Sequence, residues 1–347
     1  MPRADPWAVR ATDFPAEGSS NDKLRFLLNY AVLAPSSHNS QPWLFRLHGE
    51  EVDLIADRTR ALPVIDPRDR ELLLSCGAAL GMLRVAMRAF GYAGEVALLP
   101  NPGDEDLLAR IGLGRLHQTT VGDIALRDAI LGRRTTRVGF EPRPLPLDLI
   151  AAIKAAAAED WVRLCVHTSQ EMRAEIAALV ADADRIQFAD PSFRRELSAW
   201  MHSRHGFSRD GMSLASMGVP DLLTPISALA IRTFDMGEGR AAASQDIANG
   251  APVLAILATD RDDPEDWLLA GQALSRVLLI ATVAGVTSGY LDQPIELPLL
   301  RQRLADTMTP PAIPQLLLRL GYGPPIAPAA RRSVEDALMG EAELTHL

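Results

Sequence analysis

Two glycine-bounded segments, GAALGMLRVAMRAFG at residues 77–91 and GQALSRVLLIATVAG at residues 271–285, repeat one pattern in the two halves of the chain. Each begins with G-x-A-L and places ten residues between that leucine and the closing glycine. Each also leads to a strand-like stretch, RIGLG at 110–114 and LRLGYG at 318–323. The pattern is short enough to arise by chance, but two long apolar helices that each precede a strand favour a tandem duplication.

The composition is that of an ordinary globular protein. The chain has 347 residues, 48% of them hydrophobic and 23% charged, which suffices for about two domains or one large one. Its formal net charge of -9 argues against a nucleic-acid or acidic-membrane partner, because phosphate would be repelled. An anionic ligand would therefore need a local basic cluster.

Neither cysteine chemistry nor a targeting segment is indicated. Cys76 and Cys165 are far apart and form no CxxC motif, so we expect two small buried residues rather than a redox pair. The N-terminal MPRADPWAVR lacks the apolar core of a signal peptide, and residues 277–291 are too few and too polar to span a membrane. We therefore expect a cytoplasmic protein that does not bind membranes.

Around the first glycine-bounded segment the pattern alternates between helix and strand. Residues 22–34 predict a helix that begins with a capping box at Ser19 and Asp22 and ends at Pro35. The stretch WLFRLHGEEVDLIAD at 43–57 predicts a hairpin that turns at 48–50. A helix over 70–90 and a buried strand, LLARIGLG, follow.

The second half begins near residue 118, which gives an N-terminal unit of 1–118 and a C-terminal unit of 119–347. Its first helix carries Leu126, Ile130 and Leu131 on one face and runs into a basic segment. Residues 187–249 contain RHGFSRDGMSLASMGVP and DMGEGR and have no counterpart in the first half. They predict an insertion that covers part of the protein.

A polar loop, APSSHNSQPWLF at 34–45, separates the first helix from the hairpin. Its hydroxyls and carboxamides both donate and accept hydrogen bonds, as a ligand with a mixed edge such as the pyrimidine side of a flavin requires. The alternative is a loop whose Ser and Asn side chains only cap their own backbone. Trp43 belongs to the core in either case.

The densest group of donors is RRTTR at residues 133–137. Arginines beside hydroxyls at a helix end suit a phosphate, although a solvated surface cluster has the same composition. Arg331 and Arg332 form a second basic pair near the C-terminus.

Other catalytic patterns are weak or absent. His202 and His205 have no cysteine or carboxylate cluster beside them, so no metal site is expected. The sequence contains no nucleophile elbow, P-loop, complete dinucleotide fingerprint or paired-carboxylate motif, and hydrolysis has no support.

The loop and the basic segment together resemble the FMN-dependent nitroreductases. The pattern P-S-x-x-N-x-Q-P-W of that family is matched by Pro35, Ser36, Asn39, Gln41 and the Pro42-Trp43 pair. The family motif R-R-S-x-R resembles RRTTR, with Thr135 in place of serine, and the tail LRLGYG with RRSVEDAL resembles the closing strand and C-terminal arginine. The resemblance covers nearly the whole chain.

The resemblance implies an α+β sandwich in which two similar halves form a pseudo-dimer within one chain. Ordinary members have two identical subunits that share two FMN sites, each built from the loop of one and the arginines of the other. Here the first half has the loop without the arginine motif, and the second half has RRTTR but passes from AAAAED into WVRLCV without the loop. Trp161 would then correspond to Trp43, with the donors lost.

One complete FMN site is therefore expected, as in the Acg-type group, with residues 187–240 as a lid. A monomer would suffice for that site, and a dimer is not excluded. The resemblance places Arg133, Thr135 and Arg137 on the phosphate and ribityl chain, assisted by Arg331 or Arg332. His38 would lie nearest the substrate, and a backbone N–H within 289–293 would face flavin N5. The predicted cofactor-binding residues are Pro35, Ser36, Ser37, His38, Asn39, Gln41, Arg133, Arg134, Thr135, Arg137, Leu291, Asp292, Gln293, Arg331 and Arg332.

Two functions remain open. The first is an oxidoreductase that passes hydride from NADPH or NADH to FMN and then to a nitroaromatic, quinone or similar small acceptor. The second is a protein that stores or sequesters FMN under a closed lid, with little turnover.

Overall fold

The computed structural model describes residues 5–202, 208–213 and 224–340. Its N-terminal half contains α1 (Ser20–Ala31), β1 (Trp43–His48), β2 (Glu51–Ala56), α2 (Arg70–Ala89), β3 (Glu95–Leu98) and β4 (Leu107–Gly112). The C-terminal half contains α3 (Val121–Gly132), α4 (Leu147–Ala158), β5 (Arg163–His167), α5 (Gln170–Ala189), α6 (Pro191–Ala199), β6 (Met201–His202), β7 (Met212–Ser213), α7 (Thr224–Thr233), α8 (Gly237–Asn249), β8 (Val253–Thr259), α9 (Pro264–Val283), β9 (Thr287–Tyr290), α10 (Pro298–Asp306), β10 (Ile313–Gly321) and α11 (Val334–Ala337).

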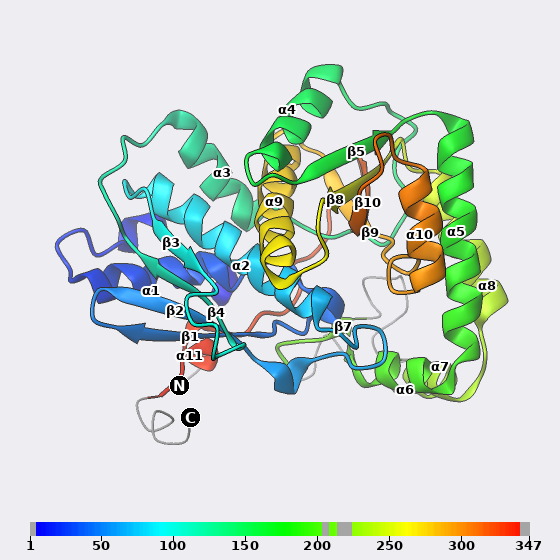
Figure 1. The fold of residues 1–347 in the computed structure, drawn as a ribbon, viewed down its shortest axis with the longest axis horizontal. Coiled ribbons are helices and arrows are strands. Elements are labelled where there is room, and N and C mark those ends of the chain that lie inside the picture. Colours follow the sequence, from blue (N-terminus) through cyan, green and yellow to red (C-terminus); the bar gives the residue numbers. More distant parts are fainter. Residues whose placement is uncertain (1–4, 203–207, 214–223, 341–347) are drawn as a thin grey trace.

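Two antiparallel four-stranded sheets share one strand order. The first runs β1-β2-β4-β3 and the second β5-β8-β10-β9. In each sheet a long helix, α2 or α9, follows the second strand and precedes the strand at the far edge. The α+β class is confirmed, and the matching orders support the predicted duplication. Figure 1 shows α2 and α9 between the two sheets.

The two glycine-bounded segments are the parts of α2 and α9 that cross. A Cβ on Gly77 would lie 2.3 Å from the carbonyl oxygen of Leu268, and a Cβ on Gly271 would lie 2.1 Å from that of Leu74. Each glycine thus faces the residue three positions before the other, which is the reciprocity expected of a pseudo-twofold contact. The helices approach this closely because neither glycine has a side chain.

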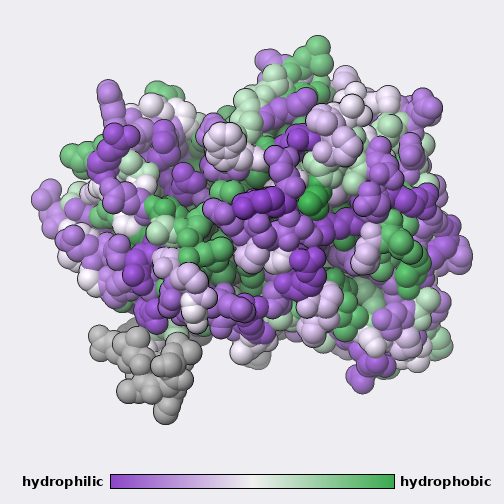
Figure 2. Space-filling view, viewed as in Figure 1, coloured by the Kyte–Doolittle hydropathy of each residue, from purple (hydrophilic) through white to green (hydrophobic). Residues whose placement is uncertain are grey.

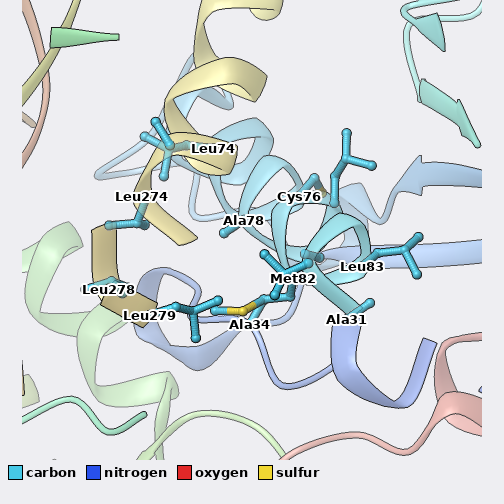
Figure 3. Packing of buried hydrophobic residues seen from close by; sticks show 14 of the residues in the cluster. Ala31, Ala34, Leu74, Cys76, Ala78, Met82, Leu83, Leu274, Leu278 and Leu279 are labelled. Atoms are coloured by element: carbon cyan, nitrogen blue, oxygen red, sulfur yellow. The ribbon is translucent and has the colours of Figure 1, made fainter. Parts of the chain in front are cut away.

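Apolar side chains surround this crossing. Figure 3 shows Leu74 and Met82 of α2 near Leu274, Leu278 and Leu279 of α9. All of these side chains are buried in one large hydrophobic cluster that also reaches both sheets. The two halves therefore share a core.

Both core helices are long and apolar enough to cross a membrane, judged by length and composition alone. However, 89% of the apolar window of α2 and 72% of that of α9 are buried within the protein. They therefore have the burial of core helices. Hydrophilic side chains predominate on the face shown in Figure 2, with smaller hydrophobic areas between them.

Most predicted elements of the first half are confirmed. The capping box at Ser19 and Asp22 is present, and the hairpin turns between β1 and β2. The short edge strand β3 was not predicted, because four residues give little periodic signal. The expected equivalence of Trp161 and Trp43 is not seen in their burial, since Trp161 is 89% exposed and Trp43 is fully buried.

The chain returns to the first half after β10. Residues 322–340 end in α11, where Leu338 forms a bridge with Phe45 of β1 and Met339 N–H donates to the Phe45 carbonyl at 2.9 Å. This C-terminal arm brings Arg331 and Arg332 beside the polar loop.

The predicted insertion corresponds to the end of α5 and to α6, α7 and α8. Parts of it, 203–207 and 214–223, lie outside the described residues, as does His205. Phe188 and Phe193 pack with Leu62 and Ile65 of the first half in a separate small cluster. The insertion therefore contacts the N-terminal half, and the domain boundaries remain a prediction.

We predict that Gly271→Ala destabilises the protein, because the new methyl group must displace helix backbone rather than a flexible side chain. We expect a loss of at least about 2 kcal/mol and a melting temperature lower by about 4 °C or more in thermal denaturation. Gly239→Ala, on the exposed face of α8 with nothing within 4 Å of its Cβ, is the matched control. Equal melting temperatures for the two variants would contradict the close crossing.

Candidate active site

One cavity of about 1220 Å³ lies where the polar loop, the basic segment, the insertion and the C-terminal arm meet. Residues from elements far apart in the sequence line it. Those predicted from the sequence are Pro35, Ser36, Ser37, His38, Asn39, Arg133, Arg134, Thr135, Arg137, Asp292, Gln293 and Arg331. The tertiary structure therefore gathers most of the predicted site.

The polar loop has an unusual backbone. His38, Asn39 and Gln41 have φ angles of 51°, 56° and 52°, in the left-handed region that side chains other than glycine rarely adopt. Hydrogen bonds hold this shape, because Ser36 Oγ accepts from Gln41 N–H at 2.9 Å and Ser37 O accepts from Ser40 N–H at 2.9 Å. Such strain, held by its surroundings, is a feature of functional loops.

Asn39 connects the loop to two other segments. Its Nδ2 donates to the Gly211 carbonyl at 3.0 Å, and its Oδ1 accepts from Arg331 Nη1 at 2.6 Å. Asn39 therefore ties the insertion and the C-terminal arm to the loop while it lines the cavity.

Gln41 and Arg332 act behind the cavity rather than on its wall. Gln41 is fully buried; its Nε2 donates to the Arg209 carbonyl at 2.8 Å, and its Oε1 accepts from Arg332 N–H at 2.8 Å. Arg332 Nη1 donates to the Gln41 carbonyl at 3.1 Å and approaches Asp57 at 3.7 Å. This differs from the direct cofactor contact predicted for both, because the hydrogen bonds turn them toward the backbone.

Leu291 is likewise outside the lining of this cavity. It is buried in the hydrophobic cluster beneath the second sheet, and its N–H donates to the Leu317 carbonyl at 2.9 Å. Its neighbours Tyr290 and Asp292 line the cavity instead.

The basic segment RRTTR begins where α3 ends. Thr136 N–H donates to the Ser288 carbonyl at 2.8 Å, so the segment runs along the edge of β9. Arg319 of β10 donates to the Thr136 and Val138 carbonyls, both at 2.8 Å. The second sheet thus fixes the position of the arginines.

The arginines form a pocket rich in unused donors. Arg133 is 3% exposed and its Nη1 donates to Thr135 Oγ1 at 3.2 Å, while its Nε has no partner among the described residues. Arg331 Nε and Tyr290 Oη are also buried without a partner. Within the described ranges no carboxylate pairs with Arg133 or Arg331. Such donors are expected where an anion binds.

Burial and mutual repulsion act on these groups. Burial lowers the pKa of Arg331 to about 9, and the nearby Arg133 charge adds to the effect. Burial raises the pKa of Tyr290, which therefore keeps its hydroxyl proton. A bound anion would relieve the repulsion between the two guanidinium groups.

Trp7 was not predicted as a site residue. Its ring lies 4.5 Å from the Arg134 guanidinium carbon and 5.4 Å from that of Arg331. Its Nε1 donates to the Ala329 carbonyl at 2.8 Å, which holds it against the C-terminal arm. An isolated tryptophan near the N-terminus carries no sequence signal for this position.

His38 is neutral at physiological pH. Burial lowers its pKa to about 4, and the charge of Arg137 acts in the same direction. The ring therefore presents one N–H donor and one acceptor to the cavity.

An ion pair and several hydrogen bonds connect the insertion to the first half of the chain, beside the polar loop. Arg60 Nη1 pairs with Asp210 at 2.8 Å and also donates to the Ser40 carbonyl at 2.9 Å. On α6, Glu196 accepts from Val64 N–H at 2.9 Å and Ile65 N–H at 3.1 Å. These contacts join the described part of the insertion to the first half of the chain.

A group of carboxyls on the cavity wall, Glu71, Asp184, Asp292 and Glu296, includes three that the sequence did not reveal. They come from α2, α5 and the segment after β9 and share no spacing pattern. Among the described residues, no group of three or more His, Cys, Asp or Glu side chains is arranged to hold a metal ion.

A family model described as "Nitroreductase family" matches residues 130–322, from the last turn of α3 through β10. The chain belongs to the nitroreductase family. The match includes the arginine segment and the strands that position it.

Relatives in the family align with almost the whole chain. Two Mycobacterium tuberculosis H37Rv proteins, named "Putative NAD(P)H nitroreductase Rv3131" and "Putative NAD(P)H nitroreductase acg", are 34% and 33% identical. The alignments cover 97% and 91% of this chain, and 96% and 95% of the respective relatives. The predicted resemblance to the nitroreductases, including the Acg group, is thereby confirmed.

A solved structure of the "FMN and NADPH-dependent nitroreductase NfnB" from sphigopyxis sp. strain HMH is 21% identical in sequence. The superposition has a TM-score of 0.41 and covers 62% of this chain and 98% of that one.

We predict that Asp210→Asn weakens the contact between the insertion and the first half of the chain. Loss of the ion pair with Arg60 should make the Gly211 and Met212 amides exchange about fivefold faster in hydrogen–deuterium exchange, which corresponds to about 1 kcal/mol. Asp246→Asn, exposed on α8, is the control and should leave this exchange unchanged. Identical exchange in both variants would show that Asp210 does not fasten the insertion.

Proposed function

We propose that this protein is an FMN-dependent oxidoreductase that takes hydride from NADPH or NADH and reduces a small acceptor such as a nitroaromatic or a quinone. The observation that carries the proposal is the buried pocket of unpaired donors around Arg133 and Arg331, which suits a phosphate. The names of the relatives, as NAD(P)H nitroreductases, support the same reaction class.

The residues of the pocket fit FMN. Arg133, Arg331 and Thr135 would hold the phosphate, with Arg134 and Tyr290 at its border. The neutral ring of His38 and the hydroxyls of Ser36 and Ser37 offer the mixed donors and acceptors that a flavin ring requires. When bound, FMN supplies the hydride-transfer chemistry, and the protein supplies position and electrostatic environment.

One chain is sufficient for this site. The polar loop comes from the first half and the arginine segment from the second, while the C-terminal arm joins them. We therefore propose a single FMN site per chain, which does not require a second copy.

The size of the cavity favours turnover. At about 1220 Å³ it is larger than a typical ligand pocket of roughly 300–1,000 Å³, so a second small molecule has room beside a cofactor.

The second candidate function is FMN storage or sequestration. The contacts of Asp210 and Glu196 with the first half favour it, because a fastened insertion would hinder entry of the nicotinamide.

We predict that the purified protein, loaded with FMN, shows a flavin absorption spectrum that bleaches within seconds of anaerobic addition of NADPH or NADH. Recovery of the oxidised spectrum on addition of a nitroaromatic or quinone would complete the cycle. Bound flavin that stays oxidised with both donors would favour sequestration. Failure to bind FMN would overturn both functions.

We predict that Arg133→Glu removes FMN from a folded protein, because it places a negative charge beside the phosphate. The bound FMN, measured from the absorbance ratio after gel filtration, should fall at least tenfold while the circular dichroism spectrum is retained. Arg303→Glu, on the exposed part of α10, reverses the same charge away from the cavity and should keep FMN. Full occupancy in Arg133→Glu would disprove the phosphate assignment.

A further inference from the structure

We propose that the carboxyl-lined wall of the cavity, formed by Glu71, Asp184, Asp292 and Glu296, binds a protonated amine on the electron acceptor. The proposal rests on the proposed oxidoreductase function and specifies its substrate class. The preferred acceptor is then a small reducible molecule that carries an ammonium group.

Two hydrogen bonds between amide and carboxylate side chains connect α5 to the segment after β9 at this wall. Gln293 Nε2 donates to Asp184 Oδ1 at 3.3 Å, and Gln187 Nε2 donates to Glu296 Oε2. Asp184 and Gln187 are three residues apart on α5, and Gln293 and Glu296 are three apart on the facing segment. The pairs therefore lie one after the other along the junction of α5 with that segment.

Acceptor atoms along this junction lack donors. Within the described part of the chain, Asp184 Oδ2, Gln187 Oε1 and Gln293 Oε1 are buried without a hydrogen-bond partner, and Asp184 and Gln293 line the cavity. Asp184, which lines the cavity, is only 2% exposed. A buried acceptor without a donor is costly, so these atoms indicate a ligand that donates hydrogen bonds.

The neighbouring carboxyls are close enough to affect one another. Burial raises the pKa of Asp292 and of Glu296 well above the usual range, and the charge of Glu71 adds to both shifts. Glu71 itself accepts from Arg70 Nη2 at 2.8 Å and from Ser37 Oγ at 2.6 Å.

In the described part of the chain, few basic side chains lie near the four carboxyls of the wall. Among the described residues, the arginines that act on these carboxyls are Arg70, beside Glu71, and Arg240, near Asp184. Burial raises the pKa of Asp184, although a hydrogen bond from Ser244 and the charge of Arg240 oppose the shift. A cationic ligand would therefore allow more of the four carboxyls to ionise.

An ammonium group matches these requirements. It carries three N–H donors, no acceptor and one positive charge. It would donate to the unpaired acceptors, and its charge would favour the ionised form of the neighbouring carboxyls. A carboxylate offers only acceptors and would leave these atoms unsatisfied, so the cavity separates an anion site at the arginines from a cation site here.

The test compares three nitroaromatics that differ mainly in charge: 4-nitrobenzylamine, 4-nitrobenzyl alcohol and 4-nitrobenzoate. With FMN-loaded protein and NADPH at pH 7, we expect kcat/KM for the amine to exceed that for the alcohol at least tenfold. The benzoate should be the poorest of the three. Equal kcat/KM for the amine and the alcohol would overturn the proposal.

Three variants test which side chains cause the preference for the amine. Asp184→Asn and Glu296→Gln should each lower the amine-to-alcohol ratio at least fivefold without lowering kcat/KM for the alcohol to the same degree. Asp182→Asn, on α5 with its side chain 45% exposed, should keep the wild-type ratio. If Asp184→Asn does not fold, the amine-to-alcohol ratio of Glu296→Gln tests the proposal. An unchanged ratio in the folded variants would place the amine elsewhere and overturn the assignment.

A binding measurement separates this proposal from the oxidoreductase function. Isothermal titration of oxidised, FMN-loaded protein with 4-nitrobenzylamine, without NADPH, should show binding that is at least fivefold weaker in Glu296→Gln. If none of the three compounds is reduced but this binding is seen, the oxidoreductase function fails and the cation site stands. If the compounds are reduced without selective amine binding, the cation site fails.

Discussion

The close crossing of α2 and α9 is the contact on which the rest of the structure depends. Gly77 and Gly271 allow helix backbone to approach helix backbone, and leucines from both helices surround the contact. Since each helix also packs beneath its own sheet, the crossing sets the position of one sheet relative to the other. A larger residue at either glycine would separate the two halves, and the site is built from both.

The cavity is a consequence of that arrangement. The polar loop precedes β1 in the first half, and RRTTR runs beside β9 in the second, so neither can form the site alone. The C-terminal arm returns to β1 and brings Arg331 against Asn39. Asp210 of the insertion pairs with Arg60, which also donates to the Ser40 carbonyl of the loop. Long-range contacts within one chain thus bring the loop, the arginine segment and the C-terminal arm to the same cavity.

The cavity wall buries basic groups in one part and carboxyl groups in another. Isolated buried charges are unfavourable, and Arg133 and Arg331 have no carboxylate partner in the described ranges. For Asp292 on the other part of the wall, burial raises the pKa of the carboxyl group. These groups are expected to be satisfied by ligands rather than by one another, because they lie on separate parts of the wall.

The sequence alone determined what depends on local order. The helices and the hairpin follow from periodicity and caps, and the motifs in 35–43 and 133–137 indicate the family. Only the tertiary structure decided which residues meet. In the folded chain, Gln41 and Arg332 form hydrogen bonds with backbone groups rather than line the cavity. Trp7 and the carboxyls of α2 and α5 line it, although the sequence did not predict them. These residues are distant in sequence, and their roles depend on burial and on partners that no local pattern records.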